Sequence, residues 1–317
     1  LGLGDPVPIS AEHGQGMGDI YDRLVPLLPA EPEEPAADAA EGAPAAAQPL
    51  SIAIVGRPNV GKSTLANRLL GEERMLTGPE AGITRDAVSI DWEYAGRPMR
   101  LVDTAGLRRR SHVVETVEKL ATSDTARAIR FAQVVILVVD ALQPMERQDL
   151  TIARSVIDEG RAMVIAVSKW DAVEDRSAAM RAVRDRLETS LQQVKGIACV
   201  PVSGATGDGI GRLMEAVFAT FEAWNRRVPT NALIRWLKAM TERHPPPMVQ
   251  GRRLRLRYLT QVKVRPPTFH LFLSRHDEMP ADYSRYIVNG LREDFDIPGV
   301  PIRLVLRQTD NPFAKEE

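Results

Sequence analysis

The chain has little of what marks a secreted, disulfide-bonded or membrane-spanning protein. Its single cysteine, Cys199, excludes an internal disulfide and favours a reducing compartment. No apolar stretch approaches the ~20 residues that a membrane helix needs, and the N-terminus shows no secretory pattern. The five histidines lack metal-ligand spacing, and His270 is expected to be a strand residue. We therefore expect a cytoplasmic protein that does not contact a membrane.

Residues 30–49 have no basic side chain. They contain four prolines, five acidic residues and many alanines. Such a segment cannot bury enough apolar surface to offset the entropy of ordering it. We predict a flexible acidic linker here.

The most informative motif is GRPNVGKS at residues 56–63. It matches G-x-x-x-x-G-K-[ST], follows an apolar run at 50–55 typical of a buried strand, and precedes a helical stretch at 63–70. Glycines let the backbone N–H groups point at phosphate oxygens, Lys62 can reach the β- and γ-phosphates, and Ser63 can bind Mg²⁺. The alternative, a Gly-rich turn with a chance lysine, is disfavoured by the flanking strand and helix. The residues expected to bind nucleotide are Gly56, Arg57, Pro58, Asn59, Val60, Gly61, Lys62, Ser63 and Thr64.

Two later strand ends indicate which base is bound. Ser168, Lys169, Trp170 and Asp171 follow an apolar run at 162–167. The Asp171 carboxylate can accept from guanine N1–H and N2–H₂, a donor pair that adenine lacks, and the Lys169 stem can lie across the base. Ser203, Gly204 and Ala205 follow a strand at 199–202, where a backbone N–H could bind guanine O6. An ATP-using kinase is therefore disfavoured.

The remaining candidates lie between these motifs. Asp103, Thr104, Ala105 and Gly106 follow the run 99–102. Asp103 can support Mg²⁺ through water, and the Gly106 N–H can sense a γ-phosphate. Thr84, in the polar loop 82–86, is a candidate for the second Mg²⁺ hydroxyl, with a surface turn as the alternative.

Taken together, these motifs and those of the tail resemble the Der (EngA) GTPases. The resemblance covers nearly the whole chain, through GRPNVGKS, GITRD, DTAGLRRR, SKWD, VSGATG, RVPTNAL, HPPP, GRRLRLRYLTQ, PPTFHLF and GVPIRL. It implies an α/β P-loop GTPase domain, a mostly parallel sheet flanked by helices, followed by an α+β KH-like domain. It also implies GTP hydrolysis and a switch in late biogenesis of the large ribosomal subunit, with the ribosome and rRNA as partners.

Members of this family carry two tandem GTPase domains before the KH-like domain. Residues 7–16 look like the guanine-binding end of an earlier GTPase domain whose phosphate loop is absent, and a freestanding amphipathic helix is the alternative. We therefore predict four segments. These are a remnant of a first GTPase domain at 1–29, a linker at 30–49, a GTPase domain at 50–225 and a KH-like domain at 226–317.

Three residues depart from common GTPase patterns. Leu107 stands where Ras-like enzymes use a glutamine to position the attacking water, so a cation or a partner would have to supply the missing help. Resemblance to K⁺-activated members of this GTPase group suggests that Asn59 helps to hold K⁺. The expected catalytic residues are Lys62, Thr84, Gly106 and Asn59, with Ser63, Thr84 and Asp103 at Mg²⁺. Ser168 replaces the usual Asn and Gly204 the usual Ala. A nucleotide-dependent, ribosome-binding scaffold with negligible GTPase activity is therefore the alternative function.

The tail is basic. Residues 226–317 contain 17 Lys and Arg against 10 Asp and Glu, and alternation through Arg255 and Arg257 predicts a strand with one arginine face. That face suits phosphate backbones, although a solvated face or an interdomain contact would look the same. Helix 230–243, strands near 253–264 and 268–274, helix 280–293 and strand 300–307 fit the family's KH-like domain. Because it has no G-x-x-G loop, docking on the GTPase domain competes with direct RNA reading. We expect a monomer.

Overall fold

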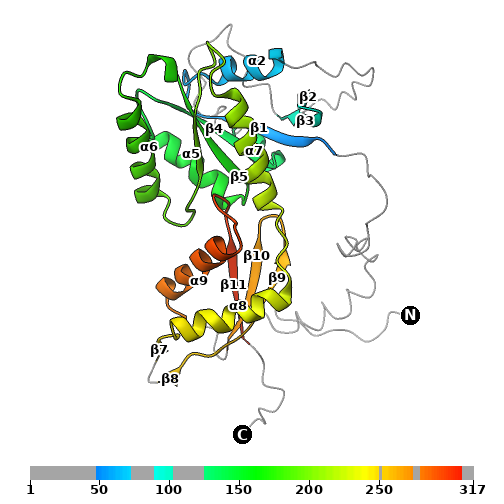
Figure 1. Ribbon diagram of the computed structural model, residues 1–317, viewed down its shortest axis with the longest axis vertical. Coiled ribbons are helices and arrows are strands. Elements are labelled where there is room, and N and C mark those ends of the chain that lie inside the picture. The colour runs from blue at the N-terminus through cyan, green and yellow to red at the C-terminus, as the bar shows by residue number, and fades with distance from the viewer. Residues whose placement is uncertain (1–47, 73–88, 103–124, 250–251, 274–278, 309–317) are drawn as a thin grey trace, which may run out of the picture. The chain divides into compact units, whose positions relative to one another are not determined.

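The computed structural model describes residues 48–72, 89–102, 125–249, 252–273 and 279–308 (Figure 1). The chain divides into two compact units, Leu1–Gln48 and Pro49–Glu317, and the described elements lie in the second. The predicted remnant at 1–29 and most of the predicted linker at 30–49 lie outside the described residues. In the described part of the chain, no helix has the length and apolarity that a bilayer span requires.

A six-stranded sheet forms the first half of this unit. Its strand order is β2-β3-β1-β4-β5-β6, and every neighbouring pair is parallel except β2 with β3. The strands are β1 (Leu50–Val55), β2 (Ile90–Tyr94), β3 (Arg97–Leu101), β4 (Val134–Asp140), β5 (Ala162–Ser168) and β6 (Ala198–Pro201).

The central strands are apolar because helices cover both of their faces. Every residue of β4 and β5 is buried. Alternate side chains belong to opposite cores: Ile136 packs in one core with residues of α2 and α7, and Leu137 packs in the other with residues of α5 and α6. The helices are α2 (Lys62–Glu72), α5 (Arg147–Asp158), α6 (Arg176–Ser190) and α7 (Ile210–Trp224). The predicted doubly covered, mostly parallel sheet is confirmed.

The tail adds a smaller α+β arrangement. Its elements are α8 (Thr230–Arg243), β7 (Met248–Val249), β8 (Arg252–Arg253), β9 (Leu256–Lys263), β10 (Thr268–Leu273), α9 (Ala281–Asp294) and β11 (Arg303–Gln308). The main sheet has the order β11-β10-β9, and β7 pairs only with β8. The predicted α-β-β-α-β order and the place of His270 in a strand are confirmed.

One predicted strand of the tail is wrong in detail. The structure divides the expected strand near 253–264 into β8 and β9, and the pairing of β9 with β10 shifts register between Leu256 and Tyr258. The shift interrupts the alternation of side chains. Arg255 and Arg257 are exposed as expected, but Tyr258 also reaches solvent. The last strand starts at Arg303 and not at Val300, since Pro301 has no N–H to donate to a ladder.

Candidate nucleotide site

The phosphate loop is a tight turn that only glycine can make at its first position. Gly56 has φ +148°, and a Cβ there would lie 2.4 Å from the Val138 carbonyl oxygen of the neighbouring strand. Asn59 and Gly61 also have positive φ, of 63° and 101°. Positive φ angles at these three positions help to bend the backbone into the concave form that presents N–H groups to an anion.

Lys62 begins α2 and folds back over this loop. Its Nζ donates to the carbonyl oxygens of Gly56 at 2.8 Å and Arg57 at 2.6 Å. The first turn of α2 contains no acidic residue, and Ser63 is partly accessible there. A helix N-terminus with a lysine and a hydroxyl at its mouth suits a phosphate chain and its cation.

The side chain of Arg57, one of the residues predicted to bind nucleotide, turns toward helix α5. Its Nε lies 3.0 Å from both Asp149 carboxylate oxygens, and its terminal nitrogens donate to Glu146 at 2.8 Å and to the Gln143 carbonyl at 3.0 Å. The guanidinium therefore anchors the phosphate loop to the start of α5, which leaves only the Arg57 backbone for nucleotide. The sequence carried one signal for these partners, since Glu146 and Asp149 have the spacing of a helix N-cap and its third residue.

The Asp149 carboxylate is fully buried and depends on this contact. Burial raises its pKa, and the charge and hydrogen bonds of Arg57, together with the Glu146 N–H, lower it in part. A buried carboxylate beside a guanidinium is stable only while both partners are present. Arg57 and Asp149 thus hold the loop as a pair.

Ser168 keeps the tie that its usual asparagine would make. Its Oγ lies 2.5 Å from the Val60 carbonyl oxygen in the phosphate loop and 3.0 Å from that of Val139, and the residue is buried. A hydroxyl has one proton, so it donates to one carbonyl at a time, where an amide could donate to two. The base-binding strand is nevertheless linked to the phosphate loop.

The residues after Ser168, predicted to bind the base, form a turn at the end of β5. Lys169 has a positive φ of 56° and pairs through Nζ with Asp140 at 2.6 Å, which fixes the direction of its stem. Asp171 lies in the short helix η1 (Trp170–Ala172) and is exposed. The Trp170 N–H donates to the Val202 carbonyl at 3.2 Å, so this turn lies beside the one that follows β6.

That second turn rests on α2. A Cβ at Gly204 would lie 3.0 Å from the Thr64 methyl group and 3.2 Å from the Leu65 nitrogen, which is a physical reason for glycine in place of alanine. Arg68 donates to the Gly204 carbonyl at 3.2 Å and to the Ala205 carbonyl at 2.5 Å. Sequence reasoning missed Arg68 and Asp140, since neither belongs to a motif.

Two predicted parts of the site lie outside the described residues. They are Thr84 and the segment Asp103, Thr104, Ala105, Gly106 and Leu107. The strand before Asp103 is described: β3 pairs with β1, and the Val102 N–H donates to the Ile52 carbonyl at 2.9 Å. The described part of this segment thus ends at Val102, beside the strand that leads into the phosphate loop.

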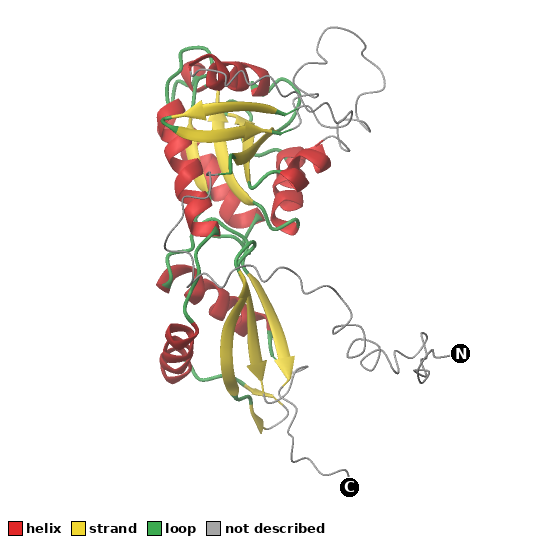
Figure 2. Ribbon diagram, turned by 90° about the vertical axis from the view of Figure 1, so that its right-hand side faces the viewer, coloured by secondary structure: helices red, strands yellow, loops and turns green. Residues whose placement is uncertain are grey.

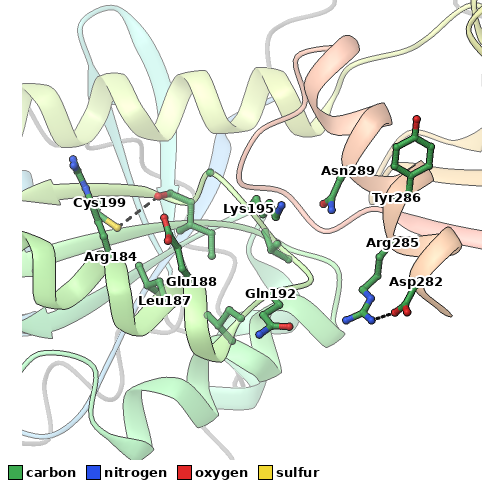
Figure 3. Close-up of a pocket in the computed structure, with 14 residues that line it drawn as sticks. Arg184, Leu187, Glu188, Gln192, Lys195, Cys199, Asp282, Arg285, Tyr286 and Asn289 are labelled. Atoms are coloured by element: carbon green, nitrogen blue, oxygen red, sulfur yellow. Dashed lines mark hydrogen bonds and ion pairs between the residues drawn. The ribbon is translucent and has the colours of Figure 1, made fainter. Parts of the chain in front are cut away.

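A cavity of about 970 Å³ is separate from these loops (Figure 3). It is lined by α6, the segment 191–197, Cys199 and α9. The cavity therefore lies near the amino end of β6, whereas the turns predicted to bind the base follow the carboxyl ends of β5 and β6. Burial raises the pKa of the Cys199 thiol to about 11, so the group stays a neutral thiol near pH 7.

The anchor between Arg57 and Asp149 generates a stability prediction. Arg57→Leu leaves a buried carboxylate unpaired and should lower the free energy of unfolding by about 3 kcal/mol at neutral pH. It also raises the pKa of Asp149 further above the unfolded value of about 3.9. Because the pKa of Asp149 is higher in the folded state than in the unfolded state, its titration favours folding fully only at pH values below the unfolded pKa. This contribution is lost as the pH rises. The deficit of the variant should therefore grow from pH 4 to pH 7 in urea unfolding.

The matched control is Arg147→Leu, which removes an exposed arginine from α5, the helix that contains Asp149. It should change stability by less than about 0.5 kcal/mol. A deficit in Arg57→Leu that does not vary with pH would mean that Asp149 is not the group at stake.

Comparison with known proteins places the site in a family. The chain is 54% identical to the GTPase Der of Brucella anthropi over 341 aligned positions, which cover 99% of this chain and 71% of that protein. It is 53% identical to the GTPase Der of a Bradyrhizobium species over 314 positions, with coverages of 99% and 69%. Among solved structures, Era in complex with MgGDPNP and a segment of 16S ribosomal RNA has 17% identity and a TM-score of 0.42, with 84% of this chain and 95% of that chain covered.

Two family models match separate parts of the chain. One, described as a 50S ribosome-binding GTPase, matches residues 51–169 and so contains the phosphate loop. The other, described as KH-domain-like of EngA bacterial GTPase enzymes, C-terminal, matches residues 227–307. The chain therefore belongs to the Der (EngA) family of GTP-hydrolysing enzymes.

Proposed function

We propose that this protein is a GTP-hydrolysing switch in late biogenesis of the large ribosomal subunit. The observation that carries the proposal is the convergence of three loops at one edge of the sheet. Ser168 bonds to Val60 of the phosphate loop, Trp170 bonds to Val202 just before residues 203–205, and Arg68 of α2 bonds to Gly204. The match to a 50S ribosome-binding GTPase model supports the partner. Acting on the ribosome, the protein would work in the cytoplasm.

Each part of the site has a role in this proposal. Lys62 and the amides of the phosphate loop stabilise charge on the transferred phosphoryl group. Ser63, Thr84 and Asp103 would hold Mg²⁺, which neutralises charge on the phosphates when bound. Hard oxygen donors suit this ion, and the described residues hold no cluster of three or more His, Cys, Asp or Glu. A site of this kind takes Mg²⁺ with the nucleotide, not in a cage of protein ligands.

The tail contacts the GTPase part in a way that supports docking of the two. Arg292 is buried and donates to the carbonyls of Gln193 at 3.1 Å and Val300 at 3.3 Å. Arg303 donates to the Asp158 carbonyl at 2.9 Å, and the Gly299 N–H to that of Lys195 at 2.9 Å. Asp158 ends helix α5, and Gln193 and Lys195 follow helix α6, on the side of the sheet remote from the nucleotide loops. We further propose that the docked protein is a monomer and contacts rRNA.

A GTP turnover assay distinguishes the proposed enzyme from a ribosome-binding scaffold with negligible GTPase activity. The scaffold alternative drew on the replacement of Asn by Ser168, but Ser168 retains a hydrogen bond to the phosphate loop. Steady-state GTP hydrolysis with Mg²⁺ and K⁺ therefore decides between them. Turnover that is no faster than buffer would favour the scaffold.

The exposed Asp171 carboxylate predicts a change of base preference. Asp171→Asn loses a charge-assisted pair to guanine N1–H and N2–H₂, worth about 1.5–3 kcal/mol, so GTP affinity should fall at least about tenfold. Xanthosine triphosphate should gain affinity, because its C2 carbonyl can accept from the new amide. Titration of both nucleotides into both proteins measures this. Unchanged GTP affinity would remove Asp171 from the site.

The missing glutamine predicts dependence on a monovalent cation. Asn59 is exposed at the outer turn of the phosphate loop, where its side-chain oxygen could help to hold K⁺. A cation there would supply the positive charge that an arginine finger supplies elsewhere. GTP hydrolysis should be faster in KCl than in NaCl at equal ionic strength, and Asn59→Ala should remove most of the difference.

The control for this experiment is Lys62→Ala, which should impair binding and turnover in either salt. Equal rates in both salts for the unmodified protein would exclude the cation and point to activation by a partner.

A further inference from the structure

Among the described residues, the helices of the tail cover only one face of its three-stranded sheet. Leu233 and Leu237 of α8 and Ile287 and Leu291 of α9 pack in one core with Leu259, Phe269 and Leu271 of the sheet. Figure 2 shows both helices on the same side of this sheet. The alternate residues of each strand therefore face away from the helices. Among the described residues, this open face is formed by Tyr258, Thr268, His270, Phe272, Arg303, Val305 and Arg307, whereas the Thr260 hydroxyl on the outer strand contacts that of Thr230 in α8 at 3.3 Å.

Aromatic side chains lie on this open face. Tyr258 and Phe272 are cross-strand partners with ring centroids 5.6 Å apart, and the Tyr258 residue is 38% exposed. Neither ring belongs to the hydrophobic core of the described residues. His270 lies two residues from Phe272 on the same face, and burial, with the charge of Arg307, lowers its pKa. Its ring is therefore neutral near pH 7 and, like the other two, offers a flat surface for stacking.

The charged residues of the three described strands are all basic. Strands β9, β10 and β11 contain no Asp or Glu, and Arg307 is the cross-strand partner of Phe272. Arg257, exposed at the register shift of β9, precedes Tyr258 in the chain. Aromatic rings beside arginines suit a polyanion whose bases can stack on the rings and whose phosphates can pair with the guanidinium groups. An acidic protein surface would match the charge but would leave the rings without a stacking partner.

We propose that the open face of β9, β10 and β11 binds single-stranded RNA, with bases stacked on Tyr258 and Phe272 and phosphates paired with Arg307. This inference rests on the proposed ribosomal function and names the part of the chain that contacts rRNA. The site differs from a G-x-x-G cleft, which the tail lacks. It also lies at the end of the sheet away from Arg303, which bonds to Asp158 of the GTPase part.

Binding of a labelled, unstructured RNA oligonucleotide of about twelve nucleotides to the intact chain tests the proposal. Tyr258→Leu and Phe272→Leu keep apolar bulk but remove the rings, and each should weaken binding at least about fivefold. Tyr258→Phe keeps the ring and should bind like the parent. Arg307→Gln should reduce the slope of log affinity against log salt by about 0.7.

Controls separate this site from general charge and from the nucleotide site. Arg235→Gln, which removes an exposed arginine from α8, should leave the affinity for the oligonucleotide nearly unchanged. The same RNA annealed to its complement should bind more weakly and with little difference between Tyr258→Leu and the parent, because paired bases cannot stack on the rings. GTP turnover should be the same in all these variants.

Two results would overturn the inference. Single-stranded binding by Tyr258→Leu and Phe272→Leu that equals the parent's would leave the face to a protein partner. A loss that Tyr258→Phe shares would show that the ring itself is not the contact. In either case, retained GTP turnover and ribosome association would leave the proposed function intact.

Discussion

The parallel order of β1, β4, β5 and β6 is the constraint on which the nucleotide site depends. Parallel neighbours bring their carboxyl ends to one edge, so loops far apart in the chain meet there. Burial on both faces holds these strands in register, because a shift by one residue would exchange the two cores. The site is thus an outcome of packing, and its polar ties adjust what the sheet has already brought together.

Those ties converge on the phosphate loop from separate elements. Arg57 anchors one side to α5, Ser168 holds the Val60 carbonyl from β5, and Lys62 closes over the loop from within. Because the loop holds several residues at positive φ, these ties from neighbouring elements help to keep its shape. Preorganised N–H groups stabilise phosphate charge without reordering at the moment of reaction.

Much of this could be read from the sequence. The phosphate loop, the order of the tail elements and the place of His270 depend on local patterns, which chemistry near in sequence determines. The Arg57–Asp149 pair could not be predicted from the sequence, because the two residues are 92 positions apart and only the fold brings them together. Strand β4 is apolar throughout, but no nucleotide motif follows it, so the motifs alone do not point to its place in the sheet. The register shift at Tyr258 was hidden because alternation in the sequence continues through it.

The two halves of the chain divide the proposed work between them. The GTPase part binds and hydrolyses the nucleotide, and the tail, whose Arg292 and Arg303 hydrogen-bond to GTPase residues, would dock there and carry the contacts to RNA. Co-sedimentation with purified ribosomal subunits in a non-hydrolysable GTP analogue and in GDP tests this account most directly. The account predicts association with the large subunit, not the small one, and more of it with the analogue than with GDP. Equal association in both nucleotides, or none with the large subunit, would contradict it.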